Sequence, residues 1–234
     1  EHISFKVEKG QTLAIIGATG SGKTTLASLI PRFYDATAGT VLVDGLDVRE
    51  YTFDALYNKL GYVTQKAVLF SGTVEDNVFF GQSAAEKTDA SLQAALSLSQ
   101  AAEFVDKYPE KAAHPIAQLG RNVSGGQKQR LSIARALART PEILIFDDSF
   151  SALDYKTDAT LREGLAKELP GTTKIIVAQR ISTIRNADQI LVLDRGEIAG
   201  LGTHDELMVS CPVYREIAMS QLSEEELKKG GASK

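Results

Sequence analysis

The chain has 234 residues, of which 43% are hydrophobic and 24% charged, and its formal net charge is −4. This length fits one large α/β domain, or a core domain with a smaller attached subdomain, and the composition is that of a folded globular protein. The acidic balance argues against long-range attraction to nucleic acid or anionic lipid. The apolar runs are only a few residues long, far short of the roughly 20 needed to cross a bilayer.

Two further features of the chain concern its cellular setting. The single cysteine, Cys211, has no partner for an internal disulfide, which fits a reducing compartment. The N-terminus lacks the basic region and apolar stretch of a signal peptide, and Glu1 enters in the middle of a domain pattern. We therefore expect the chain to be a piece of a longer polypeptide.

Short β-rich runs alternate with helical patterns along the chain, which predicts a mostly parallel sheet covered by helices. Strands are predicted at "TLAIIG", "GTVLVDG", "KLGYVTQ", "PEILIFDD", "TTKIIVAQR" and "DQILVLDRGEIAG". Helices are predicted over residues 24–33, 127–138, 156–168 and 181–186.

One stretch interrupts this alternation. From about residue 74 to residue 119 the pattern is helical without a strong strand candidate, which predicts an inserted helical subdomain. The expected fold is α/β, with a core at 1–73 and 128–222, a helical subdomain at about 74–127 and a charged, Gly/Ser-containing tail at 223–234.

The segment "GATGSGKT" follows a predicted strand, precedes a predicted helix and matches the phosphate-binding pattern G-x-x-x-x-G-K-[ST]. Its glycines let successive backbone N–H groups point toward phosphate oxygens. We expect Lys23 to reach the β- and γ-phosphates, Thr24 to give its hydroxyl to Mg²⁺, and Thr25 to be a neighbouring phosphate contact. The other contacts, mainly from the backbone, are expected from Gly17, Ala18, Thr19, Gly20, Ser21 and Gly22.

A carboxylate follows the apolar run "ILIF". Asp147 stands at the C-terminal end of this predicted strand, where open α/β sheets bind ligands. Alone, an aspartate in this position is better explained as a helix cap. Because the chain also has a phosphate-binding loop, we expect Asp147 to hold Mg²⁺ through water, with ATP and Mg²⁺ as the cofactors.

A second anion-binding nest is predicted in "NVSGGQKQRLSIARAL", where Ser124, Gly125 and Gly126 stand at a helix start. A second phosphate site requires a second nucleotide surface. This stretch resembles the signature motif of the ATP-binding cassette (ABC) family, in which Gln127 also matches and Val123 replaces the usual leucine.

The resemblance covers essentially the whole chain. "YVTQ", which ends at Gln65, resembles the family's Q-loop, "SALD" its D-loop, and "FSGTVEDNVFFG" the exporter branch. It implies a P-loop ATPase core in which Gln65 contacts the metal and transmits closure to the membrane domain. It also implies a head-to-tail dimer, in which the signature of one subunit closes over ATP held by the other. A transmembrane domain would precede Glu1, the chain would lie at the cytoplasmic face of the membrane, and no nucleic acid partner is expected.

Two departures from the family pattern fall at the positions of the chemistry. Asp148 stands where the family has a glutamate that polarises the attacking water, and Gln179 stands where it has a histidine that contacts the γ-phosphate. The resemblance therefore implies a hydrolytically impaired site in one half of a heterodimeric exporter of the multidrug type. Gln118 also replaces a frequent glutamate, so contacts with the membrane domain are expected to differ. The upstream aromatic residue that stacks on adenine is absent from this sequence.

Two alternatives stay open at this point. A non-transport ABC ATPase acting on nucleic acid or ribosomes would need basic patches or long inserted arms between Gln65 and Ser124, and neither is evident. A nucleotide-gated structural partner without turnover would differ from the exporter subunit only in rate.

Overall fold

The computed structural model describes residues 2–82 and 87–221. The chain forms two compact units, which we call the first unit (Glu1–Thr52 with Thr173–Lys234) and the second unit (Phe53–Thr172). The tail predicted at 223–234 lies outside the described residues, and the boundaries predicted for the helical subdomain stay a prediction.

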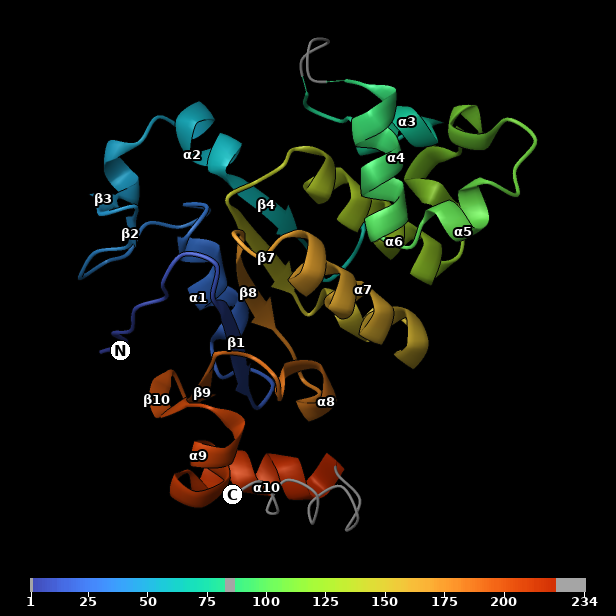
Figure 1. Ribbon diagram of the computed structural model, residues 1–234. Coiled ribbons are helices and arrows are strands. Elements are labelled where there is room, and N and C mark those ends of the chain that lie inside the picture. The colour runs from blue at the N-terminus through green and yellow to red at the C-terminus, as the bar shows by residue number, and fades with distance from the viewer. Residues whose placement is uncertain (1, 83–86, 222–234) are drawn as a thin grey trace. The chain divides into compact units, whose positions relative to one another are not determined.

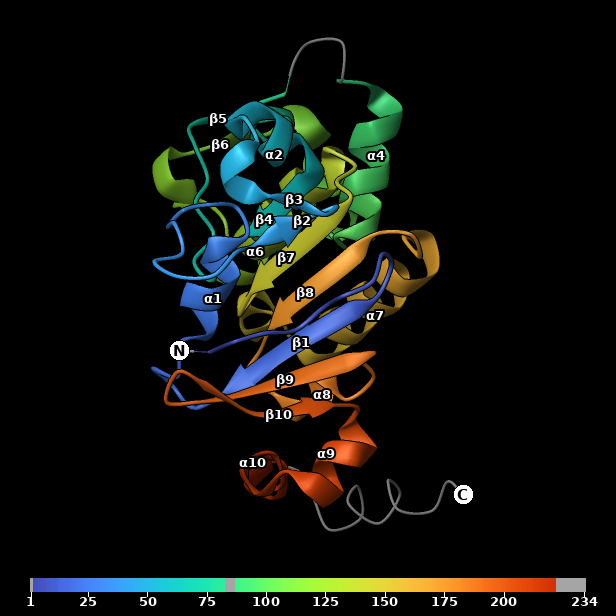
Figure 2. The ribbon, with the colours of Figure 1, turned by 90° about the vertical axis from the view of Figure 1, so that its left-hand side faces the viewer.

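The first unit contains a sheet with the strand order β10-β9-β1-β8, whose strands lie side by side in Figure 2. β1 is parallel to both neighbours, with Leu13 opposite Ile175 on one side and Gln189 on the other, and β10 is antiparallel to β9. The elements, drawn in Figure 1, are β1 (Thr12–Gly17), α1 (Lys23–Leu29), β2 (Leu42–Val43), β3 (Leu46–Asp47), a 3₁₀ helix (Val48–Glu50), β8 (Thr173–Val177), α8 (Ile181–Ile184), β9 (Gln189–Asp194), β10 (Glu197–Gly202), α9 (His204–Ser210) and α10 (Pro212–Gln221).

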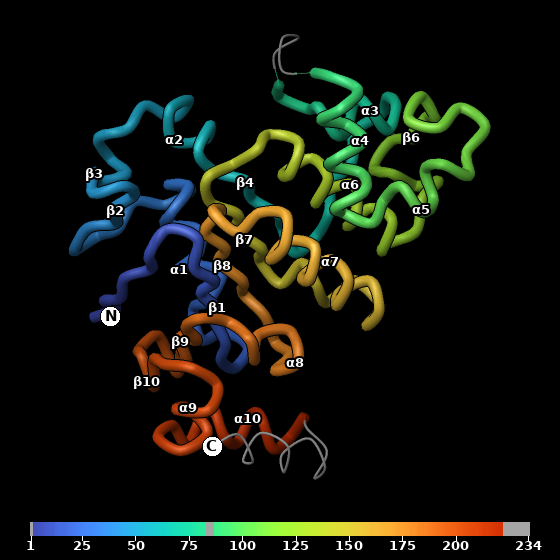
Figure 3. Tube along the Cα trace, viewed as in Figure 1, coloured from blue at the N-terminus to red at the C-terminus, as the bar shows by residue number. Residues whose placement is uncertain are grey.

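The core of the first unit is built on β1. Residues 13–16 of this strand are at most 1% exposed, because parallel strands with neighbours on both sides are buried on both faces. α9 and α10 pack against each other in the same unit and can be followed in Figure 3. Tyr214 of α10 is fully buried, and its Oη lies 2.8 Å from His204 Nδ1 of α9.

Three predicted elements of the first unit differ from the structure. The run "DQILVLDRGEIAG" is two strands, because Arg195 and Gly196 both have positive φ (47° and 82°) and form a tight hairpin turn. The run "GTVLVDG" contributes only the two-residue strand β2, which turns at Asp44 and Gly45 into β3. The helix predicted over 24–33 ends at Leu29.

The second unit contains the parallel strand pair β4 and β7, with Gly61 opposite Leu144. Residues 144–146 of β7 are fully buried. Its elements are α2 (Phe53–Lys59), β4 (Leu60–Val63), β5 (Gly72–Thr73), α3 (Val74–Val78), α4 (Asp89–Leu98), α5 (Ala102–Val105), β6 (Pro115–Ile116), α6 (Gly125–Ala138), β7 (Ile143–Asp147), α7 (Tyr155–Glu168) and 3₁₀ helices at Lys111–Ala113, Gln118–Gly120 and Ser149–Ala152.

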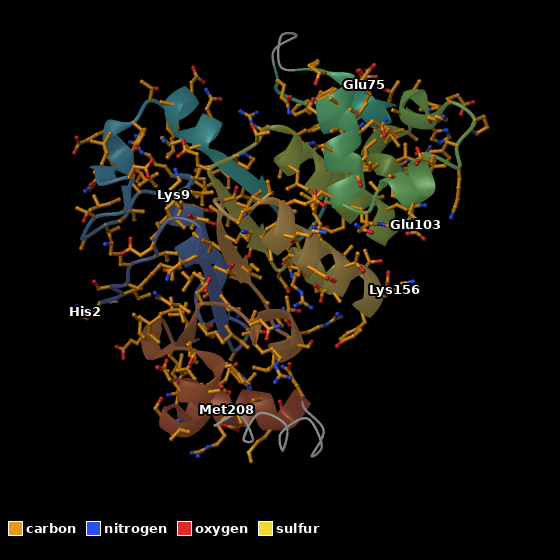
Figure 4. All side chains as sticks on the ribbon, in the orientation of Figure 1. His2, Lys9, Glu75, Glu103, Lys156 and Met208 are labelled. Carbon is orange, nitrogen blue, oxygen red and sulfur yellow. The ribbon has the colours of Figure 1, made fainter. Side chains whose placement is uncertain are left out.

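Helix α6 organises the helical part of the second unit. Arg135 of α6 donates to the backbone oxygens of Asn77 and Val68 at 2.8 and 3.0 Å. Arg130 of the same helix pairs at 2.7 Å with Glu103, which lies at the outer edge of these helices in Figure 4. Helices α3, α4 and α5 lie in the stretch predicted to be helical, while the short strand β6, which pairs with β5, lies there although no strong strand was expected.

Candidate functional site

The phosphate-binding loop lies in the first unit, between β1 and α1. A β-carbon on Gly17 would lie 2.1 Å from the carbonyl oxygen of Leu193 in β9, so no other residue fits there without moving the sheet. Gly20 and Gly22 have φ of 82° and 99°, in the left-handed region that favours glycine. The glycine spacing of the sequence is therefore required by this loop's shape.

Lys23 contributes a cation to the lining of the pocket at this loop. Its side chain is 8% exposed, and Nζ donates to the carbonyl oxygens of Gly17 and Ala18 at 2.9 and 2.8 Å. A pocket of about 180 Å³ lies beside it, lined by Gly20, Gly22, Lys23, Thr24 and Thr25. The two threonines are exposed. The Lys23 ammonium, the backbone N–H groups of the loop and the threonine hydroxyls are donors of the kind that binds phosphate oxygens.

A carboxylate pair lies in the second unit, where β7 ends. Asp147 is 5% exposed, and its Oδ2 accepts a hydrogen bond from Tyr62 Oη of β4 at 3.2 Å. The parallel register, with Tyr62 opposite Ile145, brings this tyrosine to the end of β7. Tyr62 is not among the predicted site residues, and the pairing of β4 with β7 is what brings it close to Asp147.

Asp148 is held by Gln65. Gln65 Nε2 donates to Asp148 Oδ2 at 2.9 Å, and Ser151 Oγ donates to the Asp148 backbone oxygen at 2.7 Å. Asp148 is 7% exposed and has a φ of 48°, a left-handed conformation that aspartate tolerates better than most residues. The structure thus brings together Gln65 and Asp148, which the sequence predicted as site residues from two different motifs.

The segment after β4 is tied to α6. The buried side chain of Gln129 donates through Nε2 to the backbone oxygen of Thr64, next to Gln65, at 3.2 Å. The helix that begins at the signature motif therefore contacts the loop that carries Gln65.

The signature residues form the start of α6. Ser124 is the N-cap: its hydroxyl accepts from Gln127 N, and Gln127 Oε1 accepts from Ser124 N at 2.9 Å. This reciprocal pair is a capping box. A β-carbon on Gly125 would meet nothing within 4 Å, and one on Gly126 would reach only the Ala152 backbone oxygen at 3.5 Å. Packing within the chain therefore does not require glycine at position 125.

Two other predicted positions have observed structural partners. Asp154, in the stretch resembling the D-loop, caps α7 by accepting from Thr157 N and Oγ1 at 3.0 and 2.7 Å, and these bonds lower the pKa of Asp154. Gln179 is exposed in the segment after β8, and its backbone oxygen accepts from Gln221 Nε2 at 2.8 Å. No sequence signal pointed to Gln221, because its contact depends on how α10 packs.

The donor chemistry also fits Mg²⁺. This cation takes oxygen ligands and is usually held by one or two protein groups together with substrate phosphates. In the first unit Thr24 has a hydroxyl group, and in the second unit Asp147 has a carboxylate; each is, by itself, an oxygen donor of the kind that Mg²⁺ takes. Within residues 2–82 and 87–221, no cluster of three or more His, Cys, Asp or Glu side chains could hold a metal without such help.

The fold is that of a P-loop NTPase. Its marks are a buried strand followed by a glycine-rich loop with Lys and Thr and then a helix, and a carboxylate at the end of another parallel strand. A model of the ABC transporter family matches residues 1–151, and the chain belongs to that family. Its fold is the ABC type of the P-loop NTPases, with a mostly parallel sheet and helices, so the predicted fold class is confirmed.

Individual relatives agree with this assignment. An uncharacterized ABC transporter ATP-binding protein of Mycobacterium bovis is 49% identical over 94% of this chain and 38% of the relative. Multidrug resistance protein 4 of Entamoeba histolytica is 43% identical over 94% of this chain and 17% of the relative. A solved structure of a bacterial Atm1-family ABC exporter with ATP bound has a TM-score of 0.90 and 37% identity, covering 95% of this chain and 39% of that one.

The chain thus spans less than half the length of these relatives. In the part of the chain that the structure describes, no helix has the length and apolar character to cross a membrane.

Substitutions of Ser124 and Gly125 should have different effects on the free energy of unfolding. Ser124→Ala removes the cap of α6 and should lower the free energy of unfolding by about 1 kcal/mol. Gly125→Ala, in open space near the helix start, should leave it unchanged or raise it by up to about 1 kcal/mol. Urea unfolding of the two variants beside the parent measures both. Equal destabilisation by the two substitutions would show that Gly125 is constrained within the chain.

Proposed function

We propose that the chain is the ATP-binding and ATP-hydrolysing domain of an ABC exporter, situated at the cytoplasmic face of a membrane. The observation that supports this most directly is the buried Lys23 ammonium beside a pocket lined by glycines and threonines. The structural likeness to an exporter with ATP bound supports it independently. In the full polypeptide a transmembrane domain would precede Glu1, and the relatives reported above favour transport over the nucleic-acid alternative.

The roles of the binding residues follow from their chemistry. The backbone of residues 17–22 and the Lys23 ammonium would hold the phosphates, with Thr25 as a further contact. The Thr24 hydroxyl, the Asp147 carboxylate and the Gln65 amide oxygen would be ligands of Mg²⁺, directly or through water. The chemistry that Mg²⁺ would supply there is neutralisation of the negative charge on phosphate oxygens. Tyr62 would keep the Asp147 carboxylate oriented.

The site of this chain is proposed to hydrolyse ATP slowly. Asp148 would be the group that polarises water, yet its side chain is one methylene shorter than glutamate. A misplacement of about 1 Å can lower a rate on the order of a hundredfold. In addition, Oδ2 of Asp148 is hydrogen-bonded to Gln65 Nε2. Gln179 would donate a hydrogen bond to the γ-phosphate but has no titratable nitrogen with which to exchange a proton.

The signature residues are proposed to serve a second subunit. In a head-to-tail pair, Ser124, Gly125, Gly126 and Gln127 would close over the nucleotide held by the partner. The open space around Gly125 supports this, because nothing in this chain requires a glycine there. With an impaired site in this chain and an intact signature, we propose a heterodimer in which the partner's site performs most of the turnover.

Nucleotide binding should depend on Lys23. Lys23→Ala removes the buried positive charge from the loop, so affinity for Mg·ATP should fall roughly a hundredfold or more if the charge contributes about 3 kcal/mol to phosphate binding. Isothermal titration of the 234-residue chain measures this. Lys6→Ala, which removes a side chain that is 81% exposed, is the matched control and should bind like the parent. If Lys23→Ala bound ATP as tightly as the Lys6→Ala control, the proposed phosphate site would be wrong.

In the complex with its partner subunit, Gly125→Ala should lower ATP turnover roughly a hundredfold, because it blocks backbone donors near the partner's γ-phosphate. Asp148→Ala should change turnover little, since it alters only the slow site. ATPase rates of both variants at saturating ATP provide the comparison. The reverse result, with turnover stopped by Asp148→Ala and preserved by Gly125→Ala, would exchange the roles of the two sites.

A further inference from the structure

The side chain of Gln221 bridges the segment that carries Gln179. Its Nε2 donates to the Gln179 backbone oxygen at 2.8 Å, and its Oε1 accepts from the Ile181 backbone N–H at 2.9 Å. One amide group therefore satisfies two backbone groups that lie two residues apart. Both distances are well within the usual range for N–H···O hydrogen bonds.

The helix that presents Gln221 is firmly packed. Tyr214 and Ala218 of α10 are fully buried, and Gln221 follows them at the spacing that places all three on one helix face. The Tyr214 hydroxyl is also joined to the buried His204 ring of α9 at 2.8 Å. Gln221 is itself exposed, but the helix that carries it is held in place by these buried side chains.

The bridge replaces a local cap. Helix α8 begins at Ile181 and its N-cap residue, Arg180, provides no side-chain hydrogen bond to the helix. The Gln221 oxygen takes the first N–H of this helix instead. Because the other end of the same amide holds the Gln179 carbonyl, the backbone on both sides of Arg180 is fixed, and with it the direction in which the Gln179 side chain leaves the chain.

We propose that Gln221 is a positioning residue for the γ-phosphate contact of Gln179. This inference rests on the role proposed above for Gln179 itself. The C-terminal helix would then act on nucleotide recognition through a single side chain. Loss of the two Gln221 hydrogen bonds should weaken the binding of ATP, which has a γ-phosphate, more than the binding of ADP, which lacks one. If Gln221 had a purely structural role, its loss would weaken the binding of both nucleotides alike.

Three variants of the full 234-residue chain separate these roles. Gln221→Met keeps the length and removes both hydrogen bonds. Gln221→Glu keeps an acceptor for the Ile181 N–H but loses the donor to the Gln179 carbonyl. Ser220→Ala, which removes a neighbouring hydroxyl that donates to the Ile217 backbone oxygen within α10, is the control.

Titration with Mg·ATP and with Mg·ADP gives two association constants, and the quantity to compare is the constant for Mg·ATP divided by the constant for Mg·ADP. We expect this ratio to fall about fivefold in Gln221→Met and in Gln221→Glu, as for the loss of one net hydrogen bond, and to stay unchanged in Ser220→Ala. Gln179→Ala, measured alongside, should lower the ratio at least as much.

Two results would overturn the inference, and they differ in what else they affect. If Gln179→Ala lowers the ratio while both Gln221 variants keep the parent's value, the positioning role is wrong and the role of Gln179 stands. If Gln179→Ala itself leaves the ratio unchanged, Gln179 does not contact the γ-phosphate, and both proposals are wrong.

Discussion

The absence of a side chain at position 17 is the constraint on which the phosphate-binding half of this molecule depends. A β-carbon there would collide with the Leu193 carbonyl of β9, so the close pairing of β1 with β9 and the course of the loop are fixed together. The same loop turns at Gly20 and Gly22, which have positive φ. This turn lets the Lys23 ammonium donate to the loop's first carbonyl oxygens, those of residues 17 and 18. A buried sheet thereby holds a charged group in a place where anions can approach it.

The second unit makes a different use of its parallel strands. β7 delivers two adjacent carboxylates, and each has a neutral hydrogen-bond donor: Tyr62 for Asp147 and Gln65 for Asp148. In the function proposed above, the first pair would keep an oxygen ligand available to a cation. The second would occupy an oxygen that water activation needs. Under that proposal, metal binding and hydrolysis depend on different, adjacent residues of this chain.

Much of this arrangement could be predicted from the sequence, where the signals are local. The glycines and lysine of the loop, the apolar run of β7 and the capping pattern at Ser124 each lie within a few residues and define their own geometry. The division of β9 from β10 was missed because Arg195, rather than Asn or Gly, begins the turn. The contacts of Tyr62 and Gln221 depend on strand register and helix packing, which no local pattern encodes.

Under the function proposed above, this chain binds ATP but hydrolyses it slowly, because the Asp148 side chain is one methylene shorter than glutamate and its Oδ2 accepts a hydrogen bond from Gln65. Steady-state ATP hydrolysis by the isolated chain, at saturating Mg·ATP and high protein concentration, tests this most directly, with the double variant Asp148→Glu and Gln179→His measured beside it. We expect the parent chain to turn over well below about 1 per second, the lower end of typical enzyme rates, and the double variant to be faster. Turnover of about 1 per second or more by the parent chain would contradict it.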